Sequence, residues 1–332
     1  MRKINFDIEK IKERILHHPY VTRTIEWSKE RSLPGFSKVP IYEVVVFIYL
    51  EMKRYDLFTR ANSTAFSFFL SLFPSLIAFF TLIPLFKWAL IDYLPEGENF
   101  DAYLRNEVLR IMPGVAGERV FSFIEDVTSN PRFGLLSFGF ILAIFFASNG
   151  MMALMQGFEK SYAKTFKDRN ALKKRLIAIG LTFQIGILLM GAVVLIILGE
   201  FLIGLLDSYL NLDFITEVFI QLLRWLAIVL LFYVGISVIY RYGAATKRRF
   251  SMFSPGATLA TFLCILSSLG FSFYVNEFNT YNELYGSIGA IMVLMLWIQI
   301  NSLILLVGFE LNASIAVNRD LKLGLTEDRS DL

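Results

Sequence analysis

Long apolar runs, separated by short charged segments, dominate this chain from residue 61 onwards. Five runs contain no charged residue, at 61–86, 133–158, 176–199, 250–276 and 284–309, and a sixth, at 218–240, is interrupted only by Arg224. Each run is long enough to cross a bilayer as a helix, which takes roughly 20 mostly apolar residues. The pattern therefore predicts an all-α, polytopic membrane protein with six transmembrane helices, at about residues 61–88, 133–158, 176–199, 218–240, 252–275 and 285–312.

The lysines and arginines indicate on which side of the membrane each connection lies. Of the 32 lysines and arginines, 26 lie in the first 60 residues, in the connections at 159–175 and 241–249, and in the tail from residue 317. The loop at 92–132 holds four of them. Because cytoplasmic loops carry an excess of basic residues, we predict that both termini are cytoplasmic and that the 92–132 loop lies outside.

Three regions follow from this topology: a basic cytoplasmic region at 1–60, a transmembrane domain at 61–316 and a cytoplasmic tail at 317–332. The charged first 40 residues lack the apolar core of a signal peptide, so the first span is expected to direct insertion. Helical spacing within them predicts an amphipathic helix, with a solvated basic tail as the alternative. The residues with this spacing are Ile4, Ile8, Ile11 and Ile15.

Residues 41–54 contain a short apolar stretch bracketed by Glu43 and Glu51. The stretch is too short to cross a membrane, so we interpret it as an interfacial helix that leads into the first span. The alternative is a helix packed on the bundle. In the outer loop, Pro113 and Gly114 separate two apolar patterns of helical spacing, which predicts two short helices.

The composition excludes several classes of function. Apolar residue types make up 55% of the chain and charged types only 18%, which is too apolar for a soluble enzyme. Cys264 is the single cysteine, and the only histidines are His17 and His18, so we expect no metal site, cofactor or disulfide. The chain contains no nucleotide-binding, hydrolase or nucleic-acid-binding motif. We therefore expect neither an enzyme nor a nucleic-acid partner.

Polar residues inside the predicted spans are the remaining candidates for function, because polar groups are costly in a bilayer. With the predicted topology, nearly all of them lie in the cytoplasmic halves of their spans. One interpretation is that they join helices through hydrogen bonds. The other is that they line a polar cavity open to the cytoplasm. The candidates are Ser67, Ser71, Asn149, Gln156, Gln184, Thr258, Gln299, Ser302 and Glu310.

Glu310 is the ionisable member of this set, and we predict that it is the functional centre. It lies nine residues before Arg319, where the sixth span is expected to end, or some 13 Å along a helix. Gln299 lies close to the same helix face. In this interpretation Glu310 faces Asn149 and Gln156 and binds a proton, a cation or a polar head group. Alternatively, it reaches the interface or caps a neighbouring helix.

Prolines and small residues predict where helices bend or pack closely. Pro74 and Pro84 each remove a backbone hydrogen bond from the first span, so we predict a kink at both. Gly286 and Gly289 open the sixth span, where small residues let another backbone approach. Structural roles in bending or packing are therefore assigned to Pro74, Pro84, Pro255, Gly256, Gly286, Gly289 and Asn312.

Several segments together resemble the YihY/BrkB family of bacterial inner-membrane proteins, six-helix proteins once mislabelled as ribonuclease BN. The resemblance covers roughly residues 45–312. It is carried by AFSFFLSLFP at 65–74, by SNG at 148–150 before a basic loop with Arg169 and Arg175, and by SPGA at 254–257, YGSIGA at 285–290 and GFELN at 308–312. It implies an inner-membrane location, a role in envelope integrity or serum resistance, and transport of lipid or small solutes.

Two functions therefore stay open. The first is a transporter or lipid-handling permease with a cytoplasm-facing polar cavity, whose substrate is an unknown small solute or lipid. The second is an envelope scaffold or resistance factor that acts through protein contacts. In either case the expected partners are membrane lipids and possible further copies of the chain. Ribonuclease activity is disfavoured because the chain offers no set of acid, base or metal-ligating residues.

The predicted topology can be tested by labelling single introduced cysteines from outside intact cells, after replacement of Cys264. A cysteine at Asn99 should react with a membrane-impermeant reagent, whereas a cysteine at Ser161 should not. The reason is that Ser161 lies on the side that carries 26 basic residues, which is predicted to be cytoplasmic. Labelling at Ser161 but not at Asn99 would show that the orientation is opposite to the predicted one.

Overall fold

The computed structural model describes residues 19–54, 56–91, 105, 118, 121–122, 133–210, 214–277 and 280–330. The amphipathic helix expected from Ile4 to Ile15 lies outside these residues. So do nearly all residues of the two helices expected in the 92–132 loop.

In its described part, the chain is helical, which confirms the all-α class. Two helices, α2 (Pro19–Glu30) and α3 (Ile41–Arg54), precede the first predicted span. Each predicted span then corresponds to one long helix: α4 (Leu57–Ile91), α7 (Phe133–Gly157), α8 (Ala171–Leu210), α9 (Phe214–Val238), α10 (Pro255–Glu277) and α11 (Thr280–Ser330).

By length and composition, four stretches within these described helices can cross a membrane: Ala171–Ala192, Val218–Gly243, Pro255–Tyr274 and Ile291–Lys322. A shorter apolar stretch, Ile141–Gly157, lies in α7. The chain therefore has the helices of a multi-pass membrane protein. That six of them span the membrane stays a prediction.

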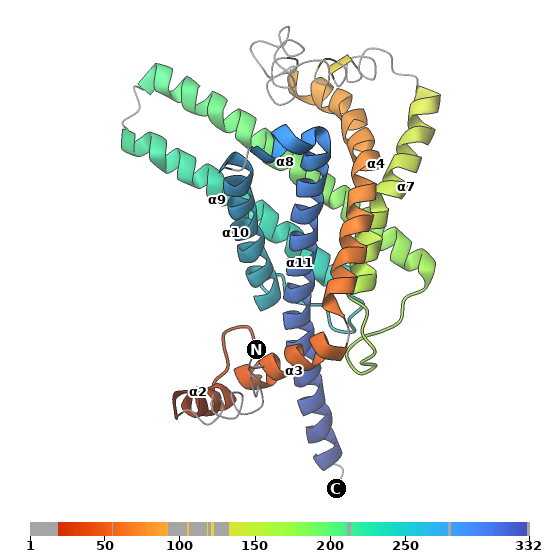
Figure 1. The fold of residues 1–332 in the computed structure, drawn as a ribbon, viewed down its shortest axis with the longest axis vertical. Helices are drawn as coiled ribbons and strands as arrows, with labels where there is room; N and C mark the ends of the chain where they lie inside the picture. The colour runs from red at the N-terminus through yellow and green to blue at the C-terminus, as the bar shows by residue number, and fades with distance from the viewer. Residues whose placement is uncertain are drawn as a thin grey trace, which may run out of the picture.

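Figure 1 shows α11 running along the long axis of the molecule, with α4 and α7 on one side and α10 on the other. α4 packs against both α7 and α11, and α10 packs against α11 and α9. α8 and α9 lie together and extend away from this centre, while α3 lies across the lower part of α11 and α2 packs on α3. α11 is thus the element that contacts α3, α4, α7 and α10.

α3 has two different faces. Val44 and Glu51 are buried on the face toward α11, and the hydroxyl of Ser314 donates to the Val44 carbonyl over 3.1 Å. The other face exposes apolar side chains, which suits a helix at the membrane interface. These exposed residues are Tyr42, Val45, Tyr49 and Leu50.

The first predicted span forms one continuous helix, α4, which passes through Pro74 and Pro84 without a break. Near Pro74, the hydroxyl of Ser71 donates to the Phe68 carbonyl over 2.8 Å, and that of Ser75 donates to the Ser71 carbonyl over 2.6 Å. Neither proline ends the helix, and the kinks predicted at both prolines are not confirmed.

The connections at the α3 end of the bundle are tied to one another. A π-helix that the sequence does not signal, η2 (Ile239–Gly243), follows α9. The Arg169 guanidinium donates to the carbonyls at its end, over 2.7–3.0 Å, which are those of Tyr242, Gly243 and Ala244. Phe166 and Thr246 form an isolated β-bridge. The loop after α7 is therefore fixed at its far end to the loop after η2.

The start of α10 crosses α11 at very short range. A Cβ atom at Gly256 would lie 2.0 Å from the Gly308 carbonyl oxygen, so only glycine fits there. The buried Asn312 side chain accepts from the Gly256 amide over 2.9 Å and donates to the Ser254 hydroxyl over 3.0 Å. Gly286 and Gly289 lie within α11, and the close approach predicted for them stays a prediction.

This crossing predicts different effects for two glycines of the same helix. Gly256→Ala should destabilise the protein by about 2–3 kcal/mol, because the added methyl group pushes two backbones apart. Gly270→Ala is the matched control, since nothing apart from the neighbouring backbone of its own helix lies within 4 Å of the position of its Cβ, and alanine should be neutral or stabilising there. Unfolding of both variants in detergent measures the difference, and equal stabilities would contradict the close crossing.

Candidate functional site

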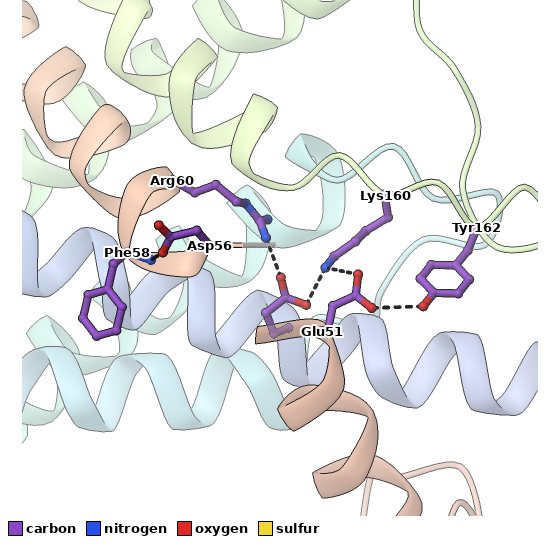
Figure 2. A network of polar contacts seen from close by, with 7 residues as sticks. Glu51, Asp56, Phe58, Arg60, Lys160 and Tyr162 are labelled. Carbon is purple, nitrogen blue, oxygen red and sulfur yellow. Dashed lines mark hydrogen bonds and ion pairs between the residues drawn. The ribbon is translucent and has the colours of Figure 1, made fainter. Parts of the chain in front are cut away.

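Charged side chains from separate parts of the sequence meet where α3 lies across α11 (Figure 2). Lys160 Nζ lies 3.0 Å from Glu51 Oε1 and 2.8 Å from Glu310 Oε2. Arg60 Nη1 lies 2.9 Å from Glu310 Oε1, and the Tyr162 hydroxyl donates to Glu51 Oε2 over 3.0 Å. These five residues are called the charge cluster below.

Capping at the start of α4 places Arg60. Asp56 Oδ1 accepts hydrogen bonds from the backbone amides of Phe58 and Thr59, over 3.1 and 3.3 Å, which is the arrangement of an N-cap. The Thr59 hydroxyl and amide hold the pKa of Asp56 below its ordinary value. The Arg60 amide makes the first bond of the helix, to the Asp56 carbonyl, so its guanidinium leaves α4 in the first turn.

Packing at the end of α7 places Lys160. Gly157 ends the helix against α11, where a Cβ atom would lie 2.8 Å from Leu306 Cδ2. The ring of Phe158 then stacks on that of Phe309, with centroids 4.4 Å apart. Because Phe309 is the neighbour of Glu310, this stacking brings the non-helical residue Lys160 beside the Glu310 carboxylate.

The charge cluster is nearly removed from solvent. The side chains of Lys160, Glu310 and Glu51 are 1%, 2% and 3% exposed, and that of Arg60 is 20% exposed. Two carboxylates and two cations balance in charge. Burying charges is expensive, and removal of one partner from a buried pair typically costs about 3–5 kcal/mol because the other charge is left uncompensated. The cluster therefore holds these segments together only while it is complete.

One oxygen in this cluster is met differently from the rest. Glu310 Oε2 is buried and is contacted by no backbone amide or hydroxyl group among the described residues. It is met instead by the Lys160 ammonium, as an ion pair at 2.8 Å. Chemically, the arrangement can hold a positive charge between two carboxylates. The described part of the chain has no group of three or more His, Cys, Asp or Glu side chains arranged to hold a metal ion.

The candidates predicted on α11 lie in different surroundings. Glu310 is in the charge cluster, and Ser302 is buried on the same helix. Gln299 donates from Nε2 to Asn62 Oδ1 on α4 over 2.7 Å. α4 also supplies Ser71, which is buried, and Ser67, which is partly buried.

The two candidates on α7, Asn149 and Gln156, are not part of the charge cluster. Arg175 Nη1 donates to Asn149 Oδ1 over 2.8 Å and to the Ser148 hydroxyl over 3.0 Å, while its guanidinium lies over the Phe145 ring. Gln156 is exposed. In the described residues no hydrogen bond or ion pair joins Asn149 or Gln156 to Glu310, so the facing arrangement predicted for them stays a prediction.

The remaining two candidates lie apart from the charge cluster. Thr258 is exposed, and its hydroxyl bonds to the Ser254 carbonyl and lies 3.4 Å from the Tyr233 hydroxyl. Both polar atoms of the Gln184 side chain are buried and have no hydrogen-bond partner among the described residues.

Sequence reasoning missed four members of the charge cluster: Glu51, Arg60, Lys160 and Tyr162. The three charged ones were counted only as flanking or loop charges. A signal for Glu51 was available, since it lies four residues after Phe47 and seven after Val44, on the same apolar face of a helix. No pattern within the sequence links Glu51 to Lys160, because their partnership depends on how α3 and the loop after α7 meet.

The chain is 32% identical over 272 residues to the ribonuclease-like protein YfkH of Bacillus subtilis (strain 168), covering 79% of this chain and 91% of that protein. It is 25% identical over 286 residues to a UPF0761 membrane protein of Vibrio campbellii (strain ATCC BAA-1116), covering 84% of each. No solved structure matches the chain.

The family model described as Virulence factor BrkB matches residues 48–331. This range includes every long helix and every residue of the charge cluster. The names of the relatives agree with the apolar helices of the structure in describing a membrane protein. The resemblance found in the sequence is thereby confirmed, and the chain is an integral membrane protein that belongs to the BrkB family.

Proposed function

We propose that this protein is a transporter or lipid-handling permease of the bacterial inner membrane, whose cytoplasmic end is closed by the charge cluster. In this proposal six helices span the membrane and both termini are cytoplasmic, as the basic residues predict. The substrate is a small solute or a lipid, reached through a polar cavity between α4 and α11. The protein carries out no chemical reaction on its substrate.

The observation that carries the proposal is the charge cluster itself. Apolar side chains can make a permanent contact between helices without the desolvation cost of buried charges, and they often replace buried ion pairs without loss of stability. Ion pairs, by contrast, can be exchanged between partners or released to water, as in elements that switch between two arrangements. Lys160 and Tyr162 come from a loop, whereas Glu51, Arg60 and Glu310 come from helices. The Lys160 side chain is therefore the part that can leave, while Tyr162 keeps its contact with Glu51.

Polar groups further along α4 and α11 support a path behind this closure. Gln299 and Asn62 form a hydrogen bond between α11 and α4, and Ser302 and Ser71 are buried on the same two helices. Ser302 lies eight residues before Glu310, or about 12 Å along the helix. These groups would meet the substrate when the cluster opens.

An envelope scaffold that acts through protein contacts is favoured by a different observation. Most of the polar candidates already have partners within the protein, such as Gln299 with Asn62 and Asn149 with Arg175. A scaffold needs no more than such fixed contacts. The two functions differ in whether water ever reaches the buried polar groups.

Cysteine accessibility distinguishes them, with Cys264 replaced. In inside-out vesicles, a cysteine at Ser302 should react with a membrane-impermeant maleimide, and the reaction should become about tenfold faster when Lys160→Met removes the ion pairs with Glu51 and Glu310. A factor of ten corresponds to a shift of about 1.4 kcal/mol toward the open arrangement.

Two controls bracket the measurement. A cysteine at the exposed Ser161 should react fully, and one at Phe262, which is exposed on the surface of a predicted span, should not. If Ser302→Cys stays unreactive in both backgrounds while Ser161→Cys reacts, the cavity does not exist and the scaffold is the better explanation.

A further inference from the structure

We propose that Glu51 and Glu310 form a binding position for one monovalent cation, a proton or an alkali ion, and that the Lys160 ammonium occupies this position as a tethered competitor. The inference rests on the proposed function, because exchange of a cation for lysine would couple an ion to the opening of the bundle. It is argued from the geometry of the charge cluster (Figure 2).

The two carboxylates are oriented by groups other than Lys160. Glu51 is held through Oε2 by the Tyr162 hydroxyl at 3.0 Å, and Glu310 is held through Oε1 by Arg60 at 2.9 Å. The second oxygen of each carboxylate is turned toward one point, where Lys160 Nζ lies at 3.0 and 2.8 Å. Arg60 and its carboxylate partner would keep their contact if the ammonium left.

The second oxygen of Glu310 is the part of the site that indicates a cation. Glu310 is 1% exposed, and its Oε2 points at the shared position. Arg60 contacts the other oxygen of this carboxylate at 2.9 Å, so the Lys160 ammonium, at 2.8 Å, is the cation that Oε2 faces. A buried carboxylate oxygen that faces a single ammonium can contact a proton or a small cation in its place.

Charge balance explains why something must replace the ammonium. With Lys160 in place, two positive and two negative charges cancel. Without it, Arg60 alone faces two buried carboxylates, and one negative charge is left uncompensated in a site that is 1–3% exposed. Such a site binds a proton or a small cation rather than staying charged and empty.

The loop that carries Lys160 can supply and withdraw the ammonium. Lys160 lies in non-helical chain directly after α7, and the far end of this loop is fixed by the bridge between Phe166 and Thr246. The tether keeps the effective concentration of the ammonium high. External cations therefore compete poorly in the native protein and well in a variant without this amine.

The test is the thermal unfolding midpoint of the purified full-length protein in detergent, with sodium or potassium exchanged for N-methylglucamine at constant ionic strength. The unfolding midpoint of Lys160→Met should rise by about 3 °C or more at a saturating concentration of the alkali ion, whereas that of the native protein should not change over the same concentrations. Lys160→Gln is measured in parallel, so that a failure of one variant to fold leaves the test intact. Lys174→Met is the matched control, because Lys174 pairs with Glu159 on the surface outside the cluster.

A second arm distinguishes a proton from an alkali ion. If the site takes a proton, Lys160→Met becomes more stable as the pH falls and loses that stability as the pH rises, with no response to sodium or potassium. The groups facing the site are Glu51 on α3, Arg60 on α4, Tyr162 on the loop and Glu310 on α11.

The proposal is overturned if both Lys160 variants respond to cations and pH no more than Lys174→Met does. Its failure is separate from that of the proposed function. If stability depends on cations but Ser302→Cys is unreactive, the cation site is supported and the transporter function is contradicted. If Ser302→Cys reacts but stability does not depend on cations, the transporter function is supported and the cation site is contradicted.

Discussion

A buried charge must have a partner, and at the α3 end of this bundle that constraint determines how four segments meet. Glu51 comes from α3, Arg60 from the start of α4, Lys160 from the loop after α7 and Glu310 from α11. Since each charge has its partner on another segment, displacement of any one of them exposes or unbalances the others.

The same end of the molecule is built from close backbone contacts and arginine clamps. Gly256 and Gly308 let α10 cross α11 at a distance that no side chain would allow. Arg169 binds the end of η2, and Arg175 binds Asn149 and Ser148 on α7. These residues belong to the segments that carry the family resemblance, so the structure gives a physical reason for them: they fix the helices around the loop that delivers Lys160.

The sequence predicts the fold well, because an apolar run of the required length leaves a chain few alternatives to a helix. Each of the six predicted spans corresponds to one long helix, and the helix expected at 41–54 is α3, Ile41–Arg54. The π-helix at Ile239–Gly243 was not predicted, and the kinks at Pro74 and Pro84 stay a prediction. Both features depend on which groups replace a backbone hydrogen bond, and a pattern of residue types does not contain that information.

The candidate site was predictable only in part. Glu310 stands out because a carboxylate within an apolar helix is costly, and the structure indeed gives it two cationic partners. Those partners are Arg60 and Lys160, 250 and 150 residues away in sequence, and Lys160 looks like an ordinary basic residue of a cytoplasmic loop. The pairing of distant residues follows from tertiary packing, here the stacking of Phe158 on Phe309.

The central claim is that the buried charges act as one coupled unit. A double-mutant cycle of Glu51→Gln and Lys160→Met, read as free energies of unfolding in mixed micelles, tests it most directly. Removal of both charges leaves Arg60 and Glu310 as a balanced pair. The loss in the double variant should therefore be smaller than the sum of the single losses, by about 1–3 kcal/mol. Additive losses would show that the charges are independent and would contradict the claim.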